Sequence, residues 1–161
     1  MENIILFCLI VGVGSTIALD VWGVLVKTIT KIPPTDWGIV GRWLIGITSG
    51  NFVLDQSNKN APSLIEKATG WVFHYLVGIA YAALILLIYG VGFIENPTVM
   101  PTVIVGVILS TLAGLGILMP GLGGGFFARL IPNKLQTYVY IIVAHIIFAI
   151  AQFGFAVWFS R

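Results

Sequence analysis

Charged residues are scarce in this chain of 161 residues, since Asp, Glu, Lys and Arg together make up only 9% of it. Soluble domains contain roughly a quarter charged residues, whereas this chain is 58% hydrophobic and has a mean hydropathy of +1.04. So little charge excludes an ordinary water-exposed surface and predicts an integral membrane protein. The formal net charge of +2 is too small to suggest a nucleic-acid partner.

Cysteine and histidine are also rare, and their scarcity limits the chemistry that the chain can perform. Cys8 is the only cysteine, which excludes intrachain disulfides and cysteine-cluster metal sites. His74 and His145 are the only histidines, and they lack the close ligand spacing of an H-x-x-x-H motif. Any metal site would therefore have to be assembled from distant parts of the chain.

The chain instead contains long apolar runs. Four of them can cross a hydrocarbon core of ~30 Å at ~1.5 Å per helical residue, namely 4–26, 70–89, 100–119 and 135–159. We predict an all-α integral membrane protein whose single domain, 1–161, is a bundle of four transmembrane helices.

The longest polar connection, 27–69, contains signals for two helix starts. Residues 37–47 carry apolar side chains on a rough helical period, which is typical of a helix lying in the membrane interface. Thr35 or Asp36 is suited to cap this helix. The segment Ser63-Leu-Ile-Glu66 matches a capping box, so it predicts the start of the next helix.

A second unusual connection is the segment 120–134, which begins Pro120-Gly-Leu-Gly-Gly-Gly. It is rich in glycine yet still apolar, a composition that is poorly suited to a loop in water. Irregular backbone enters a membrane only against protein or a wet cavity. We expect this segment to approach the membrane edge, and the sequence leaves open whether it is re-entrant.

The distribution of Lys and Arg predicts the orientation. The second connection contains neither residue, whereas the first contains five and the third two, namely Lys27, Lys31, Arg42, Lys59, Lys67, Arg129 and Lys134. By the positive-inside rule, the first and third connections face the cytoplasm and both termini face the opposite side of the cell inner membrane.

Asp20 is the main candidate for a functional residue because it is the only charge within 4–26. A carboxylate at such a depth is costly unless it has a partner or faces water. The orientation places Asp20 ~9 Å, His74 ~6 Å and His145 ~15 Å from the cytoplasmic ends of their spans. The predicted site on this side includes the side chains of Asp20, Arg42, His74, Tyr75 and His145. Its predicted loop contacts come from Gly121, Gly123, Gly124, Gly125 and Arg129.

These residue types suit several roles. Asp20 and His74 could pass protons or bind a ligand, with His145 as a deeper polar group. Arg42 and the glycine N–H groups could hold an anionic headgroup or solute. Asp20, His74 and His145 could instead bind zinc or iron. Alternatively, Asp20 pairs with Arg42 or a histidine only to fix the helix packing.

Several of these strings also resemble one known family. The chain resembles a family of uncharacterised bacterial four-span membrane proteins. The resemblance rests on His145 and on four segments, namely Gly14-Ser-Thr-Ile-Ala-Leu-Asp-Val-Trp22, Gly41-Arg-Trp43, Gly70-Trp-Val-Phe-His-Tyr75 and Pro120-Gly-Leu-Gly-Gly-Gly. The resemblance covers nearly the whole chain. It implies a fold and a membrane location, but no activity, cofactor or substrate. Two positions depart from the expected pattern, because a histidine is expected near Leu54 and a glutamine in place of Met119.

We therefore expect a small membrane protein with a cytoplasm-facing polar pocket that binds or transports a small solute, a proton or a lipid headgroup. Two alternatives stay open, an accessory or assembly subunit of a larger membrane complex and a membrane enzyme with an Asp/His metal site. A non-enzymatic role is favoured over an enzymatic one, and no cofactor is clearly implied. The expected partners are the lipid bilayer and either a second copy or a larger complex.

Overall fold

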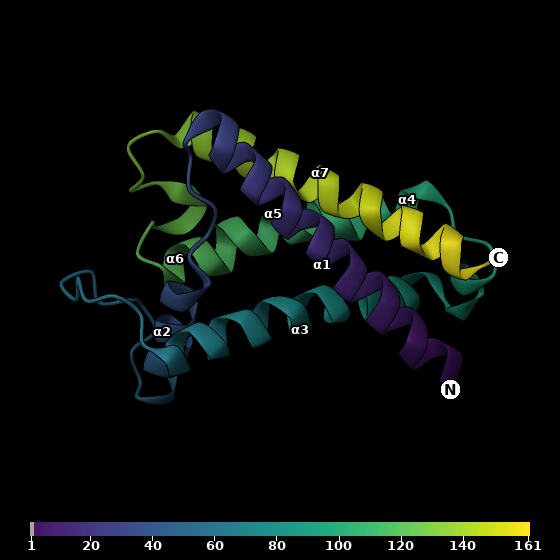
Figure 1. Ribbon diagram of the computed structural model, residues 1–161, viewed down its shortest axis with the longest axis horizontal. Helices are drawn as coiled ribbons and strands as arrows, with labels where there is room; N and C mark the ends of the chain where they lie inside the picture. Colours follow the sequence, from purple (N-terminus) through teal and green to yellow (C-terminus); the bar gives the residue numbers. More distant parts are fainter. Residues whose placement is uncertain (1) are drawn as a thin grey trace. The chain divides into compact units, whose positions relative to one another are not determined.

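The structure, a computed structural model, describes residues 2–161, and every regular element among them is a helix (Figure 1). Three helices are long and uninterrupted, namely α1 (Glu2–Thr30), α3 (Leu64–Tyr89) and α7 (Lys134–Phe159). The shorter α2 (Trp37–Thr48) lies in the first connection. Two connections contain single 3₁₀ turns, η1 (Val91–Ile94) and η4 (Phe126–Ala128).

The helix over Val99–Gly121 changes its type along its length. It is built in order from α4 (Val99–Thr102), η2 (Val103–Leu109), α5 (Ser110–Ala113), η3 (Gly114–Leu118) and α6 (Met119–Gly121). The segments η2 and η3 are π-helical, which is a wider winding than the α-helix. The sequence predicts a helix here but not the π-helical turns, because the hydrophobic pattern is apolar all round and carries no register signal.

Four helices in residues 2–161 are long and apolar enough to cross a membrane: Glu2–Thr30, Leu64–Tyr89, Val99–Gly121 and Lys134–Phe159. This confirms the predicted all-α class with four spans and identifies a multi-pass membrane protein. The helices extend past the predicted apolar runs because helical hydrogen bonding continues into the flanking polar residues. The first one, for example, runs past Lys27 to Thr30.

Both predicted helix starts in the first connection are confirmed. Asp36 caps α2, and its Oδ1 accepts hydrogen bonds from the N–H groups of Gly38 at 2.9 Å and Ile39 at 3.3 Å. At α3, the Ser63 N–H donates to Glu66 Oε2 at 2.6 Å, and the Glu66 N–H donates to Ser63 Oγ at 3.3 Å. This reciprocal pair is the predicted capping box. The position of α2 in the membrane interface stays a prediction.

The chain divides into two compact units. The first unit consists of the chain up to Pro34, together with Tyr75–Thr111 and Ile141–Arg161, so it contains α1 and parts of α3 and α7. The second unit consists of Thr35–His74 and Leu112–Tyr140, so it contains α2, the start of α3 and the glycine-rich segment.

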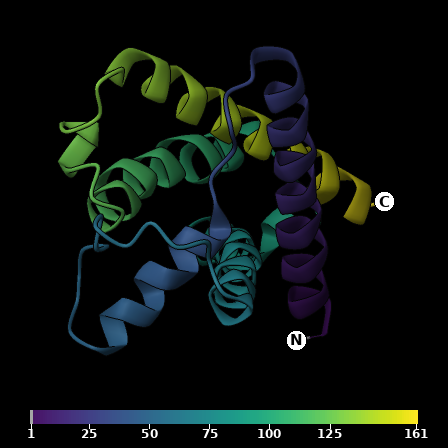
Figure 2. The ribbon, with the colours of Figure 1, turned by 60° about the vertical axis from the view of Figure 1, so that its left-hand side comes forward.

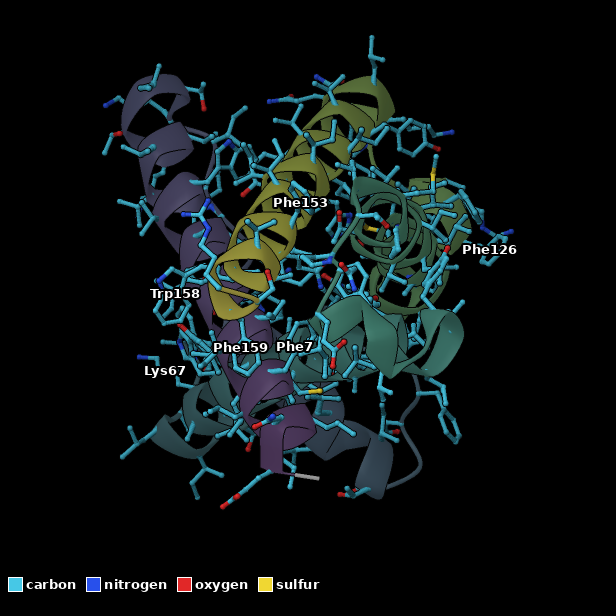
Figure 3. All side chains as sticks on the ribbon, turned by 90° about the vertical axis from the view of Figure 1, so that its right-hand side faces the viewer. Phe7, Lys67, Phe126, Phe153, Trp158 and Phe159 are labelled. Carbon is cyan, nitrogen blue, oxygen red and sulfur yellow. The ribbon has the colours of Figure 1, made fainter. Side chains whose placement is uncertain are left out.

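The core of the first unit is aromatic at the N-terminal end of α1. Phe7 is fully buried, and its ring meets Phe93 and Phe159 edge to face with centroids 6.1 and 5.5 Å apart. Figure 3 shows Phe7 and Phe159 close together where α1 and α7 meet. Further along α1, a side chain at Gly12 would overlap the backbone of Ile79, so the glycine allows α1 and α3 to approach closely.

The second unit is held together by an equally close contact between α2 and the start of α3, which lie side by side in Figure 2. A Cβ atom at Gly41 would overlap the carbonyl of Glu66, and one at Gly70 would overlap the carbonyl of Trp37. The two backbones therefore touch at this crossing, and both glycines are buried. This contact fixes the part of α2 that carries Arg42.

Candidate functional site

A cavity of about 330 Å³, lined mostly by polar residue types, lies in the second unit between α2, the rest of the first connection and the glycine-rich segment. Its lining consists of Ile39, Arg42, Leu54, Asp55, Gln56, Asn58, Lys59, Asn60 and Leu122. We call this cavity the loop pocket. It contains two of the predicted features, Arg42 and the segment that follows Pro120.

A bidentate ion pair with Glu66 fixes the position of Arg42 in the lining of the loop pocket. Its Nε donates to Glu66 Oε1 at 2.8 Å and its Nη2 to Glu66 Oε2 at 3.2 Å, while Nη2 also donates to the carbonyl of Asn60 at 3.0 Å. The hydrogen bond with Glu66 raises the pKa of Arg42 above its ordinary value. A guanidinium has five N–H donors, and the hydrogen bonds that Arg42 makes within residues 2–161 use Nε and Nη2.

The other charges in the loop pocket belong to the first connection. Asp55 Oδ1 accepts from the Ser57 hydroxyl at 2.7 Å and from the Ser57 N–H at 2.8 Å. These bonds lower the pKa of Asp55 below its usual value, so the carboxylate stays charged at neutral pH. Lys59 lies in the same lining. The loop pocket therefore presents a carboxylate and an ammonium group beside the Arg42–Glu66 pair.

The loop pocket is closed by hydrogen bonds between the first connection and the glycine-rich segment. The Leu54 N–H donates to the Gly121 carbonyl at 2.7 Å, and Gln56 Nε2 donates to the Leu122 carbonyl at 2.6 Å. Trp43 lies against Gly121, where a Cβ atom would overlap the indole ring. The position is therefore restricted to glycine by the buried tryptophan.

The predicted glycine contacts serve mainly to shape the loop. Gly123 and Gly125 have φ values of +82° and +74°, which glycine adopts more readily than other residues. The N–H groups of Gly123 and Gly124 donate to the carbonyls of Pro120 and Met119, each at 2.9 Å. These two donors are therefore already used within the loop. Arg129 is exposed at the end of η4.

Asp20 lies in the first unit, where its partner is Tyr75. The Tyr75 hydroxyl donates to Asp20 Oδ2 at 3.0 Å, and Asp20 is half-buried. One turn earlier on α1, Thr16 packs against Gly78, the residue one turn after Tyr75 on α3. Asp20 and Tyr75 therefore extend the contact between the two helices.

The two histidines have different surroundings. His74 is buried in the second unit and stacks on Trp37 with centroids 3.8 Å apart and planes 20° apart. His145 is in the first unit, where its Nδ1 lies 2.8 Å from Thr111 Oγ1. Among residues 2–161, no three His, Cys, Asp or Glu side chains are grouped so that they could hold a metal ion. The metal interpretation therefore gains no support from the geometry.

The structure gives several of the predicted residues a specific contact within their own unit. Asp20 is joined to Tyr75 and Arg42 to Glu66, while His74 packs on Trp37. The polar lining residues that sequence reasoning missed are Asp55, Gln56, Asn58, Lys59 and Asn60. It also missed the contact of Glu66 with Arg42. The capping box already marked Glu66, but its contact with Arg42 spans 24 residues and leaves no local signal.

The four long apolar helices define a multi-pass helical membrane protein, and the loop pocket lies outside its spans. The chain belongs to the family described as "Protein of unknown function (DUF2938)", whose model matches residues 9–158. No curated protein and no solved structure matches the chain.

Proposed function

We propose that this protein binds the headgroup of a zwitterionic phospholipid in the loop pocket, on the cytoplasmic side of the cell inner membrane. The observation that carries the proposal is the pairing of opposite charges in one cavity at the end of the spans. Asp55 would face the ammonium group of the lipid, while Lys59 and Arg42 Nη1 would face its phosphate.

The charge balance favours a zwitterion over an anion. Arg42 is already neutralised by Glu66, and Lys59 is balanced by Asp55 in the same lining. The loop pocket therefore has no net positive charge of its own, whereas sites for anions use unpaired cations or free N–H groups. A ligand that carries both signs satisfies Asp55 and Lys59 together.

Exposed apolar side chains close in sequence to the lining of the loop pocket favour a lipid over a soluble solute. Phe52 and Val53 directly precede the lining residue Leu54, and they are 72% and 57% exposed. Phe126 and Leu130, which follow Leu122, are 59% and 65% exposed. All four lie outside the membrane-spanning helices. Such residues suit contact with the acyl region below a bound headgroup.

Lipid retention by the purified protein tests the proposal. Native mass spectrometry would compare phosphatidylethanolamine, a zwitterion, with phosphatidylglycerol, an anion. We expect the wild type to retain the zwitterion several-fold better. Asp55→Asn keeps the acceptor for Ser57 but removes the charge, so it should abolish this preference. Lys59→Gln should weaken the retention of both lipids.

Lys134→Gln is the matched control, because Lys134 is an exposed lysine of the second unit that does not line the loop pocket. It should bind both lipids as the wild type does. Equal retention of the two lipids by the wild type would contradict the proposal. The same retention by Lys59→Gln and Lys134→Gln would contradict it as well.

A further inference from the structure

The turn η4 and the residues after it leave two phenylalanine rings and a leucine at the surface of the second unit. Phe126, Phe127 and Leu130 are exposed, whereas Ala128 between them is fully buried. The two rings meet edge to face with centroids 4.7 Å apart. We call these three exposed residues the apolar tip. Apolar side chains that gather at a surface mark a contact with another protein or with a membrane.

The backbone of the apolar tip is strained. Phe127 has φ +51° and ψ +45°, and Ala128 has φ +54°, which is the left-handed region that residues other than glycine rarely adopt. Neighbouring contacts fix this conformation, because the Tyr138 hydroxyl donates to the Phe127 carbonyl at 2.7 Å and the Ala128 N–H to the Gly125 carbonyl at 3.0 Å. Strain that the surroundings maintain is concentrated at functional sites. A phenylalanine where glycine would fit more easily indicates a use for its ring.

The position of the apolar tip in the chain keeps it near the membrane surface. The third span ends at Gly121 and the fourth begins at Lys134, so the tip lies in the segment that joins two spans. This segment is folded back on itself. The Gly124 N–H donates to the Met119 carbonyl at 2.9 Å, and the Leu130 N–H donates to the Gly124 carbonyl at 3.0 Å. The tip therefore cannot extend far from the ends of the two helices.

The charge beside the apolar tip favours the membrane interface as its partner. Arg129 directly precedes Leu130 and is exposed, and the connecting residues 122–133 contain no Asp or Glu. A guanidinium at the centre of the hydrocarbon would be costly, but its long side chain can reach lipid phosphates from the interface. Apolar side chains beside a cation, with no carboxylate in the segment, complement the boundary between phosphates and acyl chains.

We propose that the apolar tip inserts into the headgroup–acyl boundary of the bilayer, with Arg129 at the level of the lipid phosphates. The two rings and Leu130 would reach ~5–10 Å into this boundary. The glycine-rich segment is then an interfacial anchor and not a re-entrant loop. This proposal does not depend on the ligand of the loop pocket. Lipid retention by the Asp55 and Lys59 variants does not report on the depth of the tip, so the two proposals can fail separately.

Electron paramagnetic resonance of nitroxide labels on the full chain in lipid bilayers tests the depth of the tip. In a Cys8→Ala background, labels at Phe126→Cys and Leu130→Cys are compared with two references. Ala61→Cys lies at an exposed position of the first connection, and Ile108→Cys at an exposed position of the third span. The measured quantity is the ratio of collisions with oxygen to collisions with a water-soluble nickel complex. We expect this ratio at both tip sites to be several-fold higher than at the first reference and lower than at the second.

Three results of this experiment would overturn the proposal. A ratio at the tip equal to that of Ala61→Cys would mean that the tip lies in water. A ratio equal to that of Ile108→Cys would mean that the segment is re-entrant. Poor access of both reagents to the tip would mean that protein, and not lipid, covers it.

A second measurement removes the rings while the label stays in place. With the label at Leu130→Cys, the double substitution Phe126→Ser and Phe127→Ser should lower the collision ratio several-fold, towards that of the aqueous reference, because the tip loses its apolar anchor. Val91→Ser, at an exposed apolar position of the second connection, is the control and should leave the ratio unchanged. The same ratio with and without the two rings would contradict their role as an anchor.

Discussion

At the scale of single residues, Glu66 has two structural roles. Its carboxylate accepts from the Ser63 N–H at the start of α3 and also from Arg42 on α2. The N-terminal cap of α3 and the ion pair between α3 and α2 therefore depend on one side chain. Both members of the ion pair are largely buried, with side chains 11% and 18% exposed.

Replacing Glu66 by glutamine should separate these roles. The glutamine oxygen can still accept from Ser63, but Arg42 would lose its counter-charge in a partly buried place. We expect Glu66→Gln to lower the midpoint of thermal unfolding by several degrees in detergent. Glu95→Gln, at an exposed turn, should leave it unchanged. Equal midpoints for the two variants would show that the ion pair contributes little.

Single residues that stand out in the sequence could be predicted, but their contacts with distant residues could not. Asp20 was identified because a carboxylate inside an apolar run stands out without any structural knowledge. Its partner Tyr75 was placed in the same predicted site, but the hydrogen bond between them joins residues that are 55 positions apart. Likewise, the stacking of His74 on Trp37 could not be predicted, because it depends on how α2 and α3 cross.

At the scale of elements, local signals predicted most of the helices. Apolar runs identified the four spans, and short polar motifs identified the caps at Asp36 and Ser63. These signals involve neighbours in the sequence, so they can be recognised without the fold. The loop pocket could be predicted only in part, because its closing hydrogen bonds join Leu54 and Gln56 to the glycine-rich segment more than 60 residues away.

The crossing of α2 and α3 leads to a prediction at this scale. Gly70→Ala would place a methyl group on the backbone of α2, so the helices would have to separate. We expect a loss of at least about 1–3 kcal/mol in the free energy of unfolding, as for other overpacked sites. Gly154→Ala is the matched control, since its added Cβ meets nothing within 4 Å. That helical glycine should tolerate alanine or be stabilised by it, as chemical denaturation would show.

At the scale of the whole molecule, the distribution of Lys and Arg predicts the first and third connections to be cytoplasmic. Labelling of single cysteines in intact spheroplasts tests this, in a Cys8→Ala background that removes the only native thiol. A membrane-impermeant maleimide should label Glu95→Cys in the second connection but not Ala61→Cys in the first. In permeabilised cells the maleimide should label both cysteines. Labelling of Ala61→Cys but not of Glu95→Cys in intact spheroplasts would contradict the proposed orientation.

The hydrogen bonds that close the loop pocket also determine when the site can form during synthesis. Gln56 emerges from the ribosome long before Leu122, the residue whose carbonyl it binds. Domains fold as their parts become available during synthesis, so a nascent chain that ends before the third span has the first connection but no closed pocket. Closure of the loop pocket is therefore a late event in the biogenesis of this protein, after the third span has been synthesised.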